Sequence, residues 1–167
     1  MNAIPIVFLV LPILLAVAIY GEVRNRRIPN WLTLGGMALG LGSAFIENWL
    51  TGAWESCLGL MIGGGVFLPF CLLGVVGGGD MKLMAAVGAI VGYPMVLRVL
   101  TDTCIAGGLL AVAIMAWKGV LLTMLANVFR IIFGMARRRQ GLANPPMVPY
   151  GVAIAVGTLA AVFFTEF

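Results

Sequence analysis

The sequence contains no histidine, and none of its three cysteines belongs to a CxxC pair. Without histidine, no Ser-His or Cys-His pair can activate a nucleophile, which excludes the hydrolases that depend on one. A zinc site and a disulfide framework are not expected either, because they require histidines or suitably spaced cysteines. No glycine-rich stretch follows the GxxxxGK(S/T) pattern that binds nucleotide phosphates. We therefore expect no metal site and no cofactor.

Charged residues are also scarce. They make up 10% of the 167 residues, whereas 62% of the residues are apolar. The mean hydropathy is +1.12. Because so little polar surface cannot cover a water-soluble domain of this size, the chain is expected to be an integral membrane protein. Its apolar runs are continuous rather than alternating in segments of about ten residues, which favours transmembrane helices over a β-barrel.

The predicted fold is all-α, a polytopic membrane helix bundle. At roughly 20 residues per span, there is room for about six transmembrane helices in a single integral-membrane domain, 1–167, without a soluble domain. Apolar runs and helix-breaking residues predict full helices over 4–22, 31–46, 57–76, 95–117 and 150–164, a short helix over 81–92, and a loop over 47–56. The segment 120–139 has two alternatives, a further span or an amphipathic helix on the membrane surface.

The basic residues indicate how the chain is oriented. The formal net charge is +4, and seven of the ten Lys and Arg residues fall within 24–27 and 130–139. Under the positive-inside rule both stretches are cytoplasmic, with side chains that reach lipid headgroups. We attribute the positive charge to this topology and expect no nucleic-acid partner. The same topology places residues 22 and 80 at the cytoplasmic face.

Two carboxylates therefore occupy the same membrane edge. Asp80 ends the run Gly77-Gly78-Gly79-Asp80, and Glu22 lies just before the first basic stretch. An ionisable residue in such a setting indicates a function. Glu22 at the end of its helix also opposes the helix dipole, so helix stability does not explain it. If the two carboxyl groups meet, they can share one proton, so that one polarises a carbonyl while the other activates water.

Other features near these acids leave alternatives open. The three glycines before Asp80 form either a hinge or a site of close approach to another segment. Lys82 either pairs with Asp80 or extends to the lipid headgroups. Small residues spaced four apart also permit close contact between membrane helices. Such pairs are Gly36 and Gly40, Gly59 and Gly63, and Gly88 and Gly92.

Three motifs follow one another in the chain. They are Arg26-Arg27-Ile28-Pro29-Asn30-Trp31, Gly77-Gly78-Gly79-Asp80-Met81-Lys82, and Val148-Pro149-Tyr150-Gly151. With these motifs in this order, the sequence resembles the prepilin peptidase family of membrane aspartic proteases. The resemblance is in particular to the short members associated with tight-adherence and Flp-type pili. The longer members carry an insert with paired CxxC motifs that is linked to methylation. This sequence has no such insert, so no methyltransferase activity is expected here.

The resemblance implies a function and a site. It implies cleavage of the leader of type IV pilin-like precursors at the cytoplasmic face of the inner membrane, with the prepilin as partner and Asp80 and Glu22 as the catalytic acids. The residues expected to bind substrate or shape the site are Gly77, Gly78, Gly79, Lys82, Pro29 and Asn30.

Position 22 departs from the family pattern, which has aspartate there. The additional methylene moves the carboxylate by about 1.5 Å, and a misplacement of about 1 Å can cost about a hundredfold in rate. Two alternatives to an active peptidase stay open. One is a catalytically weak or inactive protein that binds pilins during assembly, and the other is a small transporter in which Asp80 carries a proton. For an active peptidase, we predict that Glu22→Asp retains or increases activity.

Overall fold

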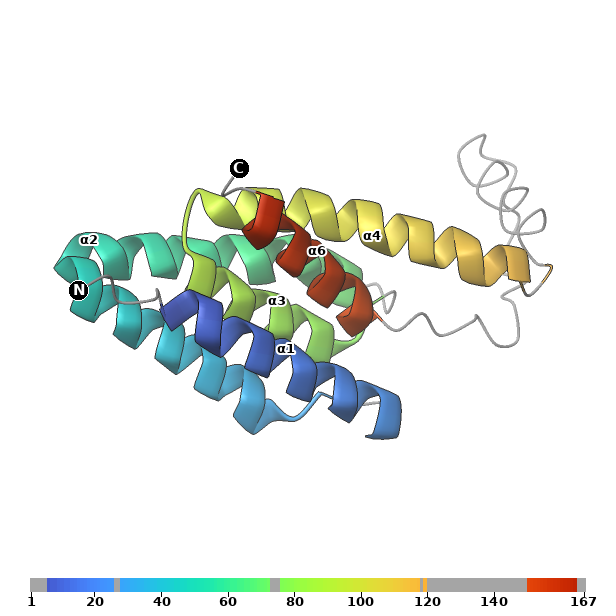
Figure 1. Cartoon of the computed structure of the whole chain (residues 1–167), viewed down its shortest axis with the longest axis horizontal. Helices are drawn as coiled ribbons and strands as arrows, with labels where there is room; N and C mark the ends of the chain where they lie inside the picture. Colours follow the sequence, from blue (N-terminus) through green and yellow to red (C-terminus); the bar gives the residue numbers. More distant parts are fainter. Residues whose placement is uncertain (1–5, 26–27, 73–75, 118, 120–149, 165–167) are drawn as a thin grey trace. The chain divides into compact units, whose positions relative to one another are not determined.

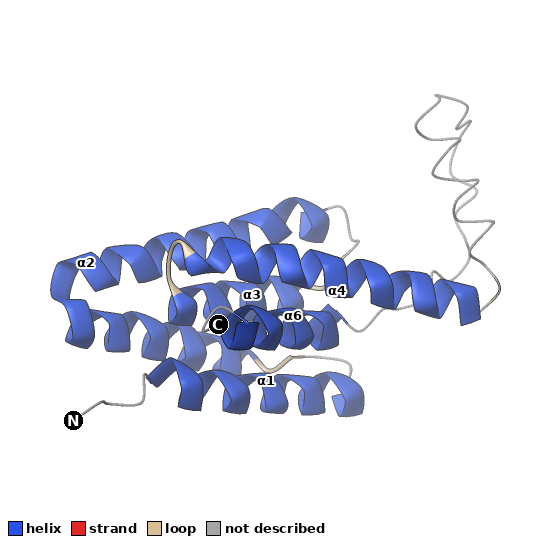
Figure 2. Ribbon diagram, turned by 45° about the horizontal axis from the view of Figure 1, so that its top comes forward, coloured by secondary structure: helices blue, strands red, loops and turns tan. Residues whose placement is uncertain are grey.

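The computed structural model describes residues 6–25, 28–72, 76–117, 119 and 150–164 (Figure 1). Every element in these ranges is a helix: α1 (Ile6–Asn25), α2 (Asn30–Leu72), α3 (Gly78–Val91), α4 (Met95–Trp117) and α6 (Tyr150–Phe164). Figure 2 shows short loops and no strand in the same ranges. The all-α prediction is thus confirmed for the described part. The predicted segment 120–139 and the linker after it lie outside the described residues.

The chain divides into two compact units, residues 1–106 with 149–167, and residues 107–148. The second unit contains the C-terminal part of α4, and the first contains the other described helices. The single domain over the whole chain stays a prediction. Helices α4 and α6 have the predicted bounds, because Pro94 and Pro149 mark their starts in the sequence.

Helix α1 continues to Asn25 and does not end at Glu22 as predicted. One face of the helix is buried, with Leu11, Leu14, Leu15 and Ala18 at 4% exposure or less. Their spacing of three and four residues is that of a helix face packed against a core. Glu22 lies one turn further along the chain from Ala18, so it is on the same side of α1.

The loop predicted over 47–56 is wrong, because α2 is helical on both sides of a two-residue break. Only Asn48 (φ −129°, ψ 22°) and Trp49 (φ 53°, ψ −134°) leave helical geometry. At this break α2 folds back on itself into two arms (Figures 1 and 2). Gly52 has no side chain, and a Cβ there would be 2.9 Å from the Cβ of Asn48. The acids and tryptophans of this stretch suggested a loop, but polar residues at a membrane edge are also compatible with helix.

The second arm of α2 ends at Leu72, four residues before the predicted end at Val76. Helix α3 starts at Gly78 and ends at Val91. The prediction of a short helix is confirmed, but it begins three residues earlier than expected. Gly78, Gly79 and Asp80 therefore form the first turn of a helix rather than a hinge before it.

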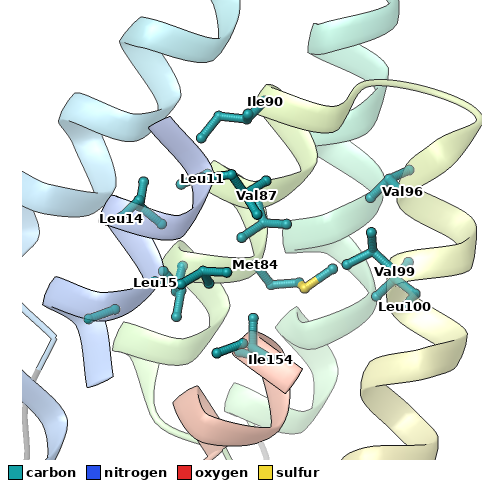
Figure 3. Close-up of a cluster of buried hydrophobic side chains, with 14 of the residues drawn as sticks. Leu11, Leu14, Leu15, Met84, Val87, Ile90, Val96, Val99, Leu100 and Ile154 are labelled. Carbon is teal, nitrogen blue, oxygen red and sulfur yellow. The ribbon is translucent and has the colours of Figure 1, made fainter. Parts of the chain in front are cut away.

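Helix α3 is the centre of this unit. All residues from Leu83 to Ile90 are buried, so the helix is covered on every side, as expected for a core helix. Figure 3 shows its side chains meeting those of the surrounding helices. The buried cluster includes Leu11, Leu14 and Leu15 of α1, Met84, Val87 and Ile90 of α3, Val96, Val99 and Leu100 of α4, and Ile154 of α6.

The predicted close contacts of small residues are present between α2 and α3. A Cβ at Gly40, in the first arm of α2, would lie 2.7 Å from the backbone of Ala89. In the second arm, Gly59 faces Gly88, and a Cβ at Gly63 would lie 2.6 Å from the carbonyl oxygen of Met84. Backbones in lipid approach this closely only where side chains are small. Both arms of α2 thus pack on α3 through glycines.

Two described helices, α2 and α4, are long and apolar enough to cross a membrane, and Val10–Glu22 and Tyr150–Val162 are shorter apolar stretches. This finding rests on length and composition. Many large apolar side chains are also exposed, for example Ile46 (81%) and Leu50 (71%). Contiguous exposed apolar surface is unusual for a soluble monomer and suits contact with lipid. The predicted number of about six spans is not established by these helices.

Candidate active site

The structure brings Glu22 and Asp80 to the same end of the helices. Glu22 lies in the last turn of α1, and Asp80 lies in the first turn of α3. Asp80 is buried, with 9% of its surface exposed, and Glu22 is partly buried. Two acids that are 58 positions apart in sequence, from 22 to 80, are therefore both at least partly withdrawn from solvent at one end of the helices.

Asp80 is held at the N-terminus of its own helix. Its backbone N–H donates to the carbonyl oxygen of Gly77 at 3.1 Å, and the N–H of Gly77 donates to the Asp80 carboxylate. A Cβ at Gly77 would lie 3.1 Å from Oδ2 of Asp80. The N–H groups in the first turn of a helix favour a negative charge. The glycine at 77 leaves the space that this side chain occupies.

Glu22 is held by a different helix, α6. The N–H of Gly151 donates to Oε1 of Glu22 at 3.4 Å, and the N–H of Val152 also donates to this carboxylate. Both N–H groups belong to the first turn of α6, where backbone N–H groups have no carbonyl acceptor within the helix itself. The other oxygen, Oε2, is buried and has no hydrogen-bond partner. The α6 N-terminus thus offsets the unfavourable dipole that α1 imposes on Glu22.

Sequence reasoning did not foresee this role of Gly151 and Val152. Gly151 belongs to the last of the three sequence motifs, but the motif alone does not predict a contact with Glu22. The signal available in the sequence was its position as the second residue of an apolar helix that starts directly after Pro149. Such a position leaves a backbone N–H free for an anion.

Lys82 contacts Asn30, which was neither of its two predicted partners. Its Nζ donates to Oδ1 of Asn30 at 3.0 Å. Asn30 is the first residue of α2, and the carbonyl oxygen of Pro29 accepts from the N–H of Leu32 at 3.2 Å, within the first turn. The hydrogen bond from Lys82 therefore fixes the start of α2 relative to the start of α3.

The three glycines before Asp80 differ in what surrounds them. A Cβ at Gly79 would lie 3.2 Å from the Cβ of Ile28, whereas a Cβ at Gly78 would have only the Sγ of Cys71, at 3.9 Å. Of the two alternatives left open above, close approach therefore applies to Gly79. A small residue is therefore required at position 79 but not at position 78.

This difference gives a first prediction. Gly79→Ala is expected to lower the free energy of unfolding by about 1 kcal/mol, because Ile28 must move. Gly78→Ala is the matched control, and it is expected not to lower stability because alanine favours helix more than glycine does. Thermal unfolding of both variants in detergent measures the effect, with about 2–4 °C expected per kcal/mol. Equal midpoints for the two variants would contradict the contact between Gly79 and Ile28.

The arrangement can share a proton between two carboxyl groups. Like charges that are close together disfavour double ionisation, so one group keeps a proton while the other stays ionised. Such a pair can act as general acid and general base. Among the described residues, no group of three or more His, Cys, Asp or Glu side chains could hold a metal ion.

The sequence model of the type IV leader peptidase family matches residues 9–112. This range includes Glu22, Asp80, Asn30 and Lys82, but not Gly151. The searches of curated proteins and of solved structures returned no match.

Proposed function

Because the chain belongs to the type IV leader peptidase family, whose members are membrane-embedded aspartic-type peptidases that act on prepilins, we propose that it cleaves a prepilin leader through Glu22 and Asp80. The observation that carries this proposal is the placement of two carboxyl groups, one partly buried and one buried, at the same end of the helices, each beside the N-terminus of a helix. A catalytic role would explain why these two of the six acidic residues are withdrawn from solvent.

The proposed reaction is peptide hydrolysis without a covalent intermediate. The protonated carboxyl group donates a hydrogen bond to the carbonyl oxygen of the scissile bond. The ionised carboxylate takes a proton from water as the water oxygen attacks the carbonyl carbon. When the tetrahedral intermediate collapses, the C–N bond breaks and the leaving nitrogen receives a proton. The pair ends with one shared proton, as it began.

The neighbouring residues are proposed to shape this site. Gly77 leaves space for Asp80, Gly79 lets Ile28 approach, and Lys82 holds Asn30. Gly78 and Pro29 belong to the same two segments. Because these contacts connect the starts of α2 and α3, they are proposed to hold the first turn of α3, and with it Asp80, in place.

We place the site at the cytoplasmic face of the inner membrane, in a multi-pass chain with about six spans. This orientation is supported by the positive-inside rule applied to the basic stretch that begins at Arg24. Exposed aromatic residues add support, because Trp and Tyr concentrate at membrane interfaces. Tyr20 and Trp31 lie near the site, whereas Trp49 and Trp54 lie at and after the break in α2.

The proposed substrate is a Flp-type prepilin, because the sequence resembles the short members of the family. Co-expression of the full chain with such a prepilin in a bacterial membrane tests the function. Mass spectrometry of the pilin is expected to show a new N-terminus at the start of its apolar helix. An intact prepilin that co-purifies with the folded chain would instead favour a pilin-binding protein, and this proposal would then be wrong.

The same assay tests the unusual glutamate. Glu22→Asp is expected to retain activity within about tenfold of the parent chain, or to exceed it, because aspartate is the residue that the family has at this position and its shorter side chain places the carboxylate where the family has it. The carboxyl group is still present and can still share a proton with Asp80. Initial rates of leader removal measure the change. Complete loss would show that the site accepts only glutamate at position 22.

A further inference from the structure

An apolar groove lies between α1 and the first arm of α2 (Figure 1). Its volume is about 260 Å³. Leu14 of α1 and Gly36 of α2 form its floor, where a Cβ at Gly36 would overlap Cδ1 of Leu14. Ile13, Trp31 and Leu39 also line the groove, and they are 58%, 69% and 57% exposed. This α1–α2 groove is therefore closed at its floor and open at its rim.

Gly35 makes a gap in the α2 side of the groove. It lies four residues after Trp31 and four before Leu39, so the three residues share one helix face. Gly35 is exposed, and a Cβ there would have no atom within 4 Å. The backbone of α2 is thus accessible between two large apolar side chains. Membrane helices approach one another most closely where a small residue exposes the backbone in this way.

One end of the groove lies near the candidate active site. Trp31 follows Asn30 directly, and Nζ of Lys82 donates to Oδ1 of Asn30. Lys82 is two positions after Asp80 in α3. From Trp31 to Leu39 the groove extends about 12 Å along α2, at about 1.5 Å per residue. A segment that lies in the groove therefore has one end near Asp80 and the other end about two helical turns away.

We infer that the α1–α2 groove holds the apolar helix of the prepilin, with the start of this helix at Trp31. The inference rests on the proposed function and deepens it, because it assigns a docking surface to the substrate. The proposed cleavage removes a leader just before an apolar helix, so that helix must be held within a few residues of Asp80. The groove meets this need because it is apolar and ends beside the start of α3. Gly35 offers the close backbone approach that holds helices together in lipid, where apolar burial gives no drive.

Photo-crosslinking in membranes that contain the full chain and the prepilin tests the docking directly. p-Benzoylphenylalanine replaces Trp31 or Leu39, and in a control chain it replaces Met61, which is 64% exposed on the second arm of α2. Both groove probes are expected to attach to the prepilin, whereas the control probe is not. The probe at position 39 should attach about eight residues further along the prepilin than the probe at position 31, as measured by mass spectrometry.

Four results of this experiment would overturn the inference. Attachment to lipid alone would make the groove a lipid site, and attachment to a second copy of the chain would make it a dimer interface. Equal attachment of the prepilin to all three probes would show no preference for the groove. A reversed order of the two attachment points would place the leader away from Asp80.

Gly35→Leu fills the gap and provides a kinetic test. Because no atom lies near the added Cβ and leucine favours helix more than glycine does, its unfolding midpoint is expected to equal or exceed that of the parent. In lipid vesicles it is expected to raise KM for the prepilin about tenfold and to change kcat less than about twofold, the pattern of lost substrate binding. Gly65→Leu is the matched control on the second arm of α2, where the added Cβ also meets no atom within 4 Å, and it should keep both constants. An unchanged KM in Gly35→Leu would contradict the docking.

The two measurements separate this inference from the proposed function. If the prepilin stays intact but attaches to the probes at positions 31 and 39, the function is wrong and the docking surface stands. If the prepilin is cleaved but attaches to neither groove probe, the function stands and the docking surface is wrong.

Discussion

Asp80→Asn is expected to abolish leader cleavage, with a rate about 10²- to 10⁴-fold below that of the parent chain, as for the loss of a general acid or base. Glu22→Gln is expected to have an effect of the same size. Each substitution keeps the shape of the side chain but removes the group that shares the proton. Neither should unfold the protein, because each relieves the repulsion between two close carboxyl groups.

The double variant sharpens this prediction. If the two acids act as a unit, Glu22→Gln combined with Asp80→Asn should be about as inactive as either single variant. Rates of leader removal for the three chains, together with their unfolding midpoints, provide the measurement. Glu47→Gln is the control, since Glu47 lies beside the break in α2 and is exposed. Cleavage that survives either single change would exclude a dyad.

The second large effect is expected from Gly88→Ala, on folding rather than on chemistry. A Cβ at Gly88 would lie 2.7 Å from the carbonyl carbon of Gly59 and 3.2 Å from Cγ2 of Val96. Because Gly59 contributes backbone at this point, no rotamer change relieves the contact, and α3 must separate from the second arm of α2. Overpacking of this kind costs about 1–3 kcal/mol. The expected outcome is a lower unfolding midpoint and less folded protein in the membrane.

Gly65→Ala is the matched control for Gly88→Ala. It changes a glycine in the second arm of α2, where no atom lies within 4 Å of the added Cβ. Its midpoint is expected to equal or exceed that of the parent chain, because alanine is the better helix former. If the two variants had equal midpoints, the close packing of Gly88 on Gly59 would be disproved.

The sequence predicted those parts of the fold that depend on local signals. Proline and glycine mark the starts of α4 and α6 and the end of α3, so their bounds could be inferred with little error. The turn within α2 has no such signal, because only Asn48 and Trp49 leave the helix. The composition of segment 47–56 is typical of a loop. The reversal of α2 there depends instead on how closely Gly52 packs against the preceding turn.

The acids of the candidate site could be proposed from the sequence, but their supports could not. The hydrogen bond between Lys82 and Asn30 joins residues 52 positions apart, and that between Gly151 and Glu22 joins residues 129 positions apart. Neither spacing carries information on its own, because such contacts are set by how the helices pack.

The contact between α6 and Glu22 also has a consequence for the order of events during synthesis. Glu22 is made 129 positions before the residue that donates to it. At about 5–20 residues per second, this interval is on the order of ten seconds. Until α6 has been translated and has packed against α1, the Glu22 carboxylate lacks its N–H donors. A nascent chain therefore carries both acids but not yet the geometry that holds the first of them, and the assembled site appears only with the last described helix.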